Sequence, residues 1–231
     1  MLQTGSLLHV VRRLFSSRRV FDLGAWPYRL LTNNIAWQTN CSRLLDGVPV
    51  GTSKLRVLDL GVGPGVSALA MGRRYPNLQF VGIDIVQRML ELAAENRHYE
   101  GWATNRLFLL RADVLRLPLL NESVDVVTGH SLLYLLEDPL QALGEALRVL
   151  RPGGFASFLE PSGGKVRWSW VWRQRSIRFF ISACLWRWYS GIHQRYSPEK
   201  LSTLLSLAGF RQPTTEESLG GFGIFARARK P

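Results

Sequence analysis

Short apolar runs alternate with amphipathic stretches through the middle of the chain. Apolar, β-branched runs that predict buried strands occupy residues 55–60, 78–83, 107–110, 124–127 and 155–159. Helical spacing of apolar side chains occupies residues 66–75, 86–99 and 139–150. Strands that alternate with helices predict right-handed crossovers and a parallel sheet covered on both faces.

The flanking segments add further elements. Residues 36–45 have helical spacing, and residues 7–15 form an amphipathic pattern with basic side chains beside the apolar face. After residue 160 the alternation stops, and it resumes with a helix over 197–208 and a terminal strand over 221–229. We therefore expect an N-terminal helical extension over residues 1–50 and one open α/β domain over residues 51–231. Residues 161–195 form an insertion in that domain.

Composition agrees with a globular protein and shows where the charge lies. The 231 residues are 46% hydrophobic and 20% charged, which excludes a disordered or fibrous chain. The formal net charge is +12. The excess is concentrated in the first 21 residues and in residues 161–195, which contain basic but no acidic residues.

The cysteines and the apolar runs bear on location. Cys41 and Cys184 are too few for a disulfide framework and lack metal-ligand spacing, which favours a reduced, cytoplasmic protein. No apolar run reaches the roughly 18 residues that a spanning helix needs, so we expect no integral membrane protein. The Arg-rich, acid-free N-terminus does not resemble a secretory signal. A membrane-surface helix and a mitochondrial-type presequence both stay open for it.

A glycine cluster follows the first predicted strand. Gly61, Gly63 and Gly65 lie between that strand and the next helix, where glycine permits a tight turn and a close approach of ligand to backbone. The dinucleotide pattern would require glycine at position 66, which is Val66, and no phosphate-binding lysine follows.

Two acids end neighbouring predicted strands. Asp84 lies about 20 residues beyond the glycine cluster, where a carboxylate accepts hydrogen bonds from ribose hydroxyls. It also fits the N-cap of the next helix. Asp113 ends the third strand and is either an acceptor for an exocyclic adenine amine or an ordinary loop acid.

The stretches VLDLGVGPG, VGIDI, RADVLRLPL, SVDVV and RVLRPGG resemble the class I S-adenosylmethionine (SAM)-dependent methyltransferases. The resemblance is greatest to the small-molecule and lipid-quinone branch, which includes the ubiquinone and menaquinone C-methyltransferases. It implies a Rossmann-like, open, mostly parallel seven-stranded sheet with helices on both faces. It also implies SAM as the cofactor.

The resemblance assigns residues to parts of the cofactor. It places Asp59, Gly61, Gly63, Gly65 and Gly129 at the methionine part, Asp84 at the ribose, Ile85 beside the adenine, and Asp113 with Val114 at the adenine edge and ring. Tyr134 departs from the family, whose members frequently carry histidine there.

Two residues are candidates for the chemistry. His130 ends the fourth predicted strand, where it would serve as a general base or would simply hydrogen-bond to backbone. Glu160 ends the fifth strand at the same edge and is expected to face the acceptor. The four histidines are scattered and show no metal-ligand pattern, so no metal is expected.

Residues 161–195 interleave five tryptophans with seven basic residues. Tryptophan suits the bilayer interface and arginine attracts anionic headgroups, so peripheral contact with the inner membrane face is one interpretation. A lid over the active site is another, and both can hold. A nucleic-acid surface is disfavoured because no recognisable RNA-binding module is present.

We therefore expect methyl transfer to a hydrophobic or lipid-like small molecule, with a prenylated quinone precursor favoured. A phospholipid amine is the alternative acceptor. A non-catalytic scaffold that binds SAM, nucleic acid or membrane is the alternative of another class. The acceptor atom and the oligomeric state do not follow from the sequence.

Overall fold

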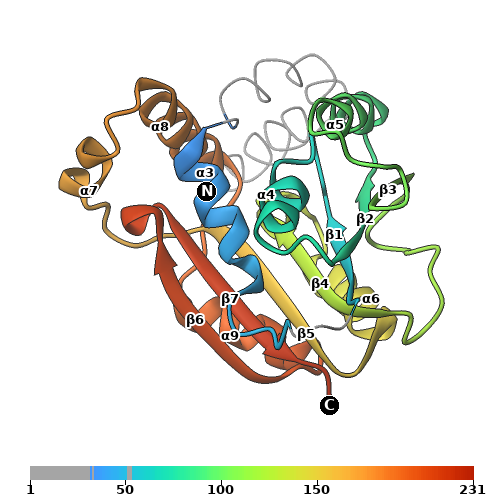
Figure 1. Ribbon diagram of the computed structural model, residues 1–231. Coiled ribbons are helices and arrows are strands. Elements are labelled where there is room, and N and C mark those ends of the chain that lie inside the picture. The colour runs from blue at the N-terminus through green and yellow to red at the C-terminus, as the bar shows by residue number, and fades with distance from the viewer. Residues whose placement is uncertain (1–31, 33, 51–53) are drawn as a thin grey trace, which may run out of the picture.

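The computed structural model describes residues 32, 34–50 and 54–231. A single seven-stranded sheet with strand order β3-β2-β1-β4-β5-β7-β6 forms its centre (Figure 1). The strands are β1 (Arg56–Leu60), β2 (Gln79–Asp84), β3 (Leu107–Arg111), β4 (Val124–His130), β5 (Leu150–Pro161), β6 (Arg211–Ser218) and β7 (Gly223–Arg229).

The first five strands are parallel, and only β7 and β6 run antiparallel to their neighbours. The sheet is open, because β3 and β6 form its two edges. The predicted Rossmann-like, mostly parallel seven-stranded architecture is confirmed. Strand order reverses between β1 and β4, so the carboxyl ends of these strands diverge and leave a crevice for a ligand.

Helices cover both faces of this sheet. They are α3 (Ile35–Ser42), α4 (Val66–Arg74), α5 (Gln87–Tyr99), α6 (Pro139–Val149), α7 (Trp168–Arg173), α8 (Ile177–Ile192) and α9 (Pro198–Leu207). In Figure 1, α3 and α4 lie in front of the sheet and α6 and α9 lie behind it. Aliphatic side chains of β1 and β4 fill the core between these layers, including Val57, Leu58, Val126 and Val127, which have at most 1% of their surface exposed.

Two features of the strands differ from the sequence prediction. The segment Pro152–Gly154 does not separate α6 from β5, because β5 begins at Leu150 and passes through this segment with an irregular register against β4. The strand β6 was missed because RQPTTEES has no apolar run. As an edge strand it buries little, and its Pro213 fits an edge position.

The insertion packs against the described part of the N-terminal extension. Residues 161–195 contain α7 and α8, and α8 lies beside α3. A buried hydrogen bond from Trp37 Nε1 to Ser182 Oγ, 2.7 Å long, joins α3 to α8. The amphipathic segment 7–15 and the basic first 21 residues lie outside the described residues. No helix within the described ranges is long and apolar enough to cross a membrane.

Candidate functional site

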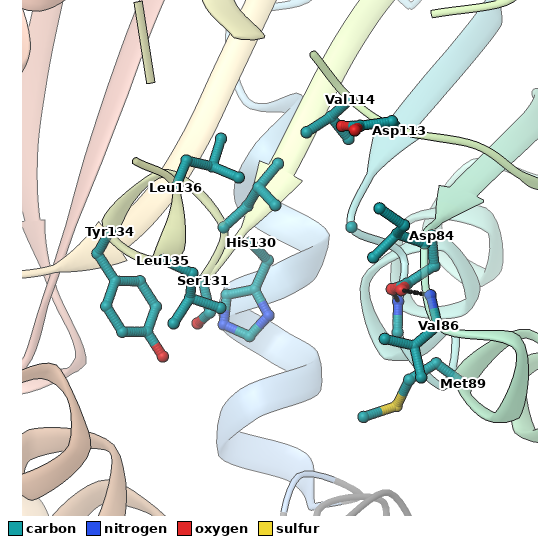
Figure 2. A pocket seen from close by; sticks show the side chains of 14 residues that line it. Asp84, Val86, Met89, Asp113, Val114, His130, Ser131, Tyr134, Leu135 and Leu136 are labelled. Atoms are coloured by element: carbon teal, nitrogen blue, oxygen red, sulfur yellow. Dashed lines mark hydrogen bonds between the residues drawn. The ribbon is translucent and has the colours of Figure 1, made fainter. Parts of the chain in front are cut away.

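A pocket of about 200 Å³ lies at the carboxyl ends of β1, β2 and β4. Figure 2 shows Asp84, Val86 and Met89 on one side of it and His130, Ser131 and Tyr134 on the other. Its lining residues are Gly61, Gly63, Asp84, Ile85, Val86, Met89, Asp113, Val114, His130, Ser131, Leu132, Tyr134, Leu135 and Leu136. None of these lining residues is a lysine or arginine, so the described wall of the pocket supplies no cation for a phosphate group.

The glycine loop after β1 adopts backbone angles that other residues rarely adopt. Gly61, Gly63 and Gly65 have φ angles of +62°, +51° and +83°. A side chain at Gly61 would also place its Cβ 2.9 Å from Leu132. Gly65 is the N-cap of α4 and faces Ala93 of α5, so its glycine serves the turn and the helix packing. Only the first two of these glycines line the pocket.

Asp84 fixes this loop from the end of β2. Its Oδ2 accepts the N–H of Gly63 and its Oδ1 accepts the N–H of Val86, both at 2.9 Å (Figure 2). Burial raises the pKa of Asp84, and these backbone hydrogen bonds oppose that increase. A carboxylate has about four lone-pair sites, so Asp84 retains acceptor capacity for hydroxyl groups in the pocket. The N-cap interpretation is wrong, because Val86 is the N-cap of α5 and Asp84 accepts the N–H of that residue in the turn before the helix. The ribose interpretation stays a prediction.

The other predicted adenine-side residues also line the pocket. Ile85 and Val114 provide apolar surface, and Val114 is buried. Asp113 is exposed, and its Oδ1 accepts the N–H of Leu115 at 2.9 Å. One carboxylate oxygen therefore holds the turn, and the other stands at the pocket rim.

Asp59 does not reach the pocket. Its side chain is fully buried between β1, α4 and β4, where Oδ2 accepts from Ser67 Oγ at 2.5 Å and Oδ1 accepts from Thr128 Oγ1 at 2.8 Å. Burial raises the pKa of Asp59 to about 6. Among the described contacts, Asp59 joins three elements under the glycine loop, and it supports the cofactor site indirectly.

Gly129 also lies behind the pocket wall. A Cβ at this position would stand 2.9 Å from the ring of Phe158 on β5, so glycine permits close packing of β4 against β5. Neither Asp59 nor Gly129 is among the lining residues. The geometry therefore does not support the expected direct contact of these two residues with the methionine part of the cofactor.

His130 projects into the pocket from the end of β4 (Figure 2). Its Nε2 is buried and has no hydrogen-bond partner. Its Nδ1 lies 3.8 Å from Cys41 Sγ, and its ring lies 5.4 Å from that of Trp37 and 6.3 Å from that of Trp186. Burial lowers the pKa of His130 to about 4, so the imidazole is neutral at pH 7. A neutral ring with an unpartnered nitrogen can accept a hydrogen bond or a proton, although the lowered pKa makes it a weaker base than an exposed histidine.

Glu160 does not face the acceptor as we expected. Its fully buried carboxylate accepts the backbone N–H groups of Leu132, Leu133 and Tyr134 at 3.0, 2.9 and 3.2 Å. Burial raises the pKa of Glu160 to about 7, and the three hydrogen bonds oppose a larger increase. The prediction that Glu160 faces the acceptor is wrong, because its side chain turns inward. Glu160 positions the backbone of residues 132–134, which form one wall of the pocket.

The segment after β4 was the part of the pocket least evident from the sequence. Ser131 has a φ of +57°, an uncommon left-handed conformation for a residue other than glycine, and its N–H donates to Leu159 O at 2.9 Å. The chain then turns so that Leu132, Tyr134, Leu135 and Leu136 line the pocket. The apolar run LLYLL carried no motif, and a positive φ at serine has no sequence signal.

The described residues contain no group of three or more histidine, cysteine, aspartate or glutamate side chains that could hold a metal ion. The observed residues do fit SAM. Its ribose requires an acceptor, its sulfonium requires closely approaching backbone, and it has no phosphate, which matches Asp84, the glycine loop and the cation-free lining. The buried, unpartnered His130 Nε2 stands across the pocket from Asp84.

Comparisons with known proteins agree with this geometry. Residues 58–158 match a methyltransferase domain family. A demethylmenaquinone methyltransferase of Thermus thermophilus is 33% identical over 181 residues, which cover 74% of this chain and 80% of the relative. A malonyl-[acyl-carrier protein] O-methyltransferase of Xylella fastidiosa is 32% identical over 59% of this chain, and the match covers 45% of that relative. The chain thus spans about half the length of that curated relative.

A solved structure shows the same fold. Phosphoethanolamine N-methyltransferase 2 of Haemonchus contortus, in complex with SAM, superposes with a TM-score of 0.68 at 19% identity. The match covers 93% of this chain and 60% of the other. The fold, the pocket and the similarity to the Thermus enzyme lead to the same conclusion: the chain belongs to the class I SAM-dependent methyltransferases.

Proposed function

We propose that this methyltransferase transfers the methyl group of SAM to a hydrophobic or lipid-like small molecule, with a prenylated quinone precursor as the favoured acceptor. The observation that carries the proposal is the aromatic surround of His130. His130 lines the pocket, its Nε2 is buried without a hydrogen-bond partner, and the rings of Trp37 and Trp186 lie 5.4 and 6.3 Å from the imidazole ring. The relative from Thermus, named for a demethylquinone substrate, supports the same acceptor class.

In this proposal the residues of the pocket divide the work. Asp84 holds the ribose, and Ile85 and Val114 flank the adenine. When bound, SAM supplies a methyl group for in-line displacement from sulfur. The chain orients the two reactants and excludes water, and such positioning contributes about 7–11 kcal/mol to lowering a barrier.

His130 acts as the general base in this scheme. A phenolic acceptor becomes a carbon nucleophile when its O–H proton leaves, and His130 Nε2 accepts that proton. This requires the tautomer with hydrogen on Nδ1, where the N–H faces Cys41 Sγ at 3.8 Å. SAM, when bound, would supply the methyl group to that ring carbon, and the proton of the ring carbon would leave to solvent, which restores aromaticity.

A phospholipid amine is the second candidate acceptor. The observation in its favour is the structural similarity to an enzyme named for phosphoethanolamine, which establishes the shared fold. The lining residues contain no lysine or arginine that would hold a phosphate, and this favours the quinone-type acceptor. We propose that both acceptors would be met at an anionic membrane surface, and the basic, Trp-rich insertion over 161–195 supports this.

An isotope experiment tests the proposed function. The purified protein is incubated with methyl-deuterated SAM and either a prenylated demethylquinol or phosphatidylethanolamine, and the products are identified by mass spectrometry. Asp84→Ala serves as the matched control for loss of the cofactor site. We expect a deuterated methyl group on the quinol ring. Label only on the amine would favour the second candidate, and label on neither, with SAM bound, would favour a scaffold.

A further inference from the structure

The outer face of α8 carries an apolar stripe. Ile177, Ile181 and Leu185 have 71%, 42% and 46% of their surface exposed and are spaced four residues apart, so they share one side of the helix. On the neighbouring helix α7, Trp168 and Trp172 are 48% and 67% exposed. We name these five side chains the α7–α8 apolar face.

Ring contacts hold the tryptophans of this face in place. The ring of Trp172 stacks on Phe180 of α8 at 5.2 Å, and Trp168 lies edge-on to Phe222 at 5.7 Å. The face is therefore built across two helices, and its exposed rings are not isolated surface residues. An apolar cluster of this kind with basic residues around it marks an interaction site.

Basic side chains surround the α7–α8 apolar face. Residues 161–195 contain no acid, and five of their seven basic residues are exposed, namely Lys165, Arg167, Arg173, Arg175 and Arg178. Arg167 has an acidic partner outside the insertion, since Glu217 lies 3.9 Å from its guanidinium group. The surface around the apolar face is thus positively charged.

Two basic residues of the insertion have a different role. Arg187 donates to the carbonyl oxygens of Ser162 and Gly164 at 2.7 and 3.2 Å, and Arg195 donates to Ser190 Oγ at 3.2 Å. These two residues brace the insertion internally. The remaining five are directed to solvent, so the positive charge belongs to the outer surface.

The inner face of α8 forms the wall behind His130. Trp186 packs edge-on against Trp37 at 4.9 Å, and Tyr189 packs edge-on against Tyr134 of the pocket at 6.3 Å. One helix therefore presents Trp186 and Tyr189 toward the pocket and the stripe of Ile177, Ile181 and Leu185 to the exterior. A surface that rests on the outer face would lie one helix away from His130.

We infer that the α7–α8 apolar face is the site where this enzyme docks on an anionic lipid surface. The inference deepens the proposed function, since docking there brings a bilayer-dissolved acceptor to the side of the molecule that encloses His130. Tryptophan suits the bilayer interface, and the exposed basic residues complement anionic headgroups. Each basic residue near an anionic membrane strengthens binding about fivefold.

Vesicle flotation tests the site without any use of catalysis. The full chain is mixed with vesicles of phosphatidylcholine alone or of phosphatidylcholine containing about 30% phosphatidylglycerol. The ionic strength of the buffer is close to the physiological value. The two test variants are Ile181→Ser/Leu185→Ser and Arg173→Gln/Arg178→Gln. Their matched controls are Leu120→Ser/Leu207→Ser and Arg116→Gln/Arg211→Gln, which change exposed residues outside the insertion.

We expect wild type and both controls to float with the anionic vesicles only. Each test variant should bind at least about 20-fold more weakly, because two apolar or two basic contacts are lost. Equal binding by test and control variants would overturn the inference. The inference would also be overturned if wild type did not bind vesicles and instead formed dimers that Ile181→Ser/Leu185→Ser dissociates. The face would then join two copies of the chain.

The outcome is separable from that of the proposed function. SAM affinity and the unfolding transition of the test variants should equal those of wild type, because the changed side chains are exposed and lie outside the pocket. Vesicle binding without methylation of any acceptor would leave the docking site standing and reject the acceptor. Methylation of a quinol without vesicle binding would support the acceptor and reject the docking site.

Discussion

The two sides of the pocket are built on different principles. On the cofactor side, each oxygen of Asp84 accepts a backbone N–H, one from Gly63 of the glycine loop and one from Val86. On the acceptor side, His130 carries a buried nitrogen without a partner and stands among aromatic rings. The cofactor side binds SAM, which all members of the family use, through an acid and a glycine loop of the family type. The acceptor side retains an unpaired nitrogen for an acceptor that is particular to this enzyme.

The difference indicates that the acceptor side of the pocket determines the specificity of the enzyme. Buried polar atoms are nearly always hydrogen-bonded, so an unpaired one beside a cavity marks a place where a ligand belongs. Trp186 Nε1, on the helix behind His130, is also buried and unpartnered. We expect substitutions on the cofactor side to change SAM affinity and substitutions on the acceptor side to change turnover.

The largest effect is expected at His130. If Nε2 receives the acceptor proton, His130→Ala should lower kcat about 10²–10⁴-fold. Because burial lowers the pKa of His130 to about 4, the imidazole stays neutral from pH 8 down to about 5. The pH profile of wild type should therefore show no step near 6.5. Full turnover in His130→Ala would remove the residue from the mechanism.

The next effect is expected in the stability of Glu160 variants. Glu160→Ala leaves three buried N–H groups unpaired and should lower the free energy of unfolding by about 3–5 kcal/mol. Glu160→Gln keeps one acceptor oxygen and should cost about 1–3 kcal/mol. Denaturant titration of both variants measures the difference. Equal stability of all three proteins would show that the carboxylate does not hold this segment.

Glu160 also predicts a pH dependence with a defined sign. Its folded pKa of about 7 is raised above the ordinary value near 4.5, so protonation favours the folded state. This contribution is fully present below about pH 4.5 and is lost as the pH rises through 7. The stability advantage of wild type over Glu160→Gln should therefore shrink as the pH rises from about 4.5 to about 7. A growing advantage over that interval would contradict the assignment.

On the cofactor side, Asp84→Ala should weaken SAM binding about 100-fold. The carboxylate supports two loop N–H groups and, in our account, the ribose hydroxyls, and each hydrogen bond to a charged group contributes about 1.5–3 kcal/mol. Asp84→Asn retains one acceptor oxygen and should be intermediate. Isothermal calorimetry gives the affinities, and an unweakened Asp84→Ala would show that the ribose lies elsewhere.

The smallest effect is expected at Asp113. Its side chain is exposed and one oxygen already accepts the N–H of Leu115, so solvent screens its interaction with the adenine edge. Asp113→Asn should weaken SAM binding by a factor of about 2–5. A loss as large as that of Asp84→Ala would mean that the adenine contact is far stronger than its exposure indicates.

The comparison also explains how much of the molecule could be predicted from the sequence. The strands β1 to β5 were predicted because buried parallel strands form continuous apolar runs. Asp84 and Gly63 were predicted because the glycine conformation and the acid at the end of β2 are local features of the chain. The polar edge strand β6 was missed, since its pairing with β7 is set by tertiary contacts.

The acceptor side was harder to predict for the same reason. Glu160 was expected in the pocket because it ends a strand at the right edge, and sequence does not show that its carboxylate turns toward the N–H groups of residues 132–134. The packing of Trp37 and Trp186 around His130 joins segments about 150 residues apart, which no local pattern encodes. Only the residue types of the insertion indicated an unusual surface.

The most direct test of this account is a calorimetric titration of SAM into wild type, Asp84→Ala and His130→Ala side by side. The account predicts that Asp84→Ala loses about 100-fold in affinity and that His130→Ala stays within about threefold of wild type while its turnover falls. Equal losses in the two variants, or a loss in His130→Ala alone, would contradict the division of the pocket into a cofactor side and an acceptor side.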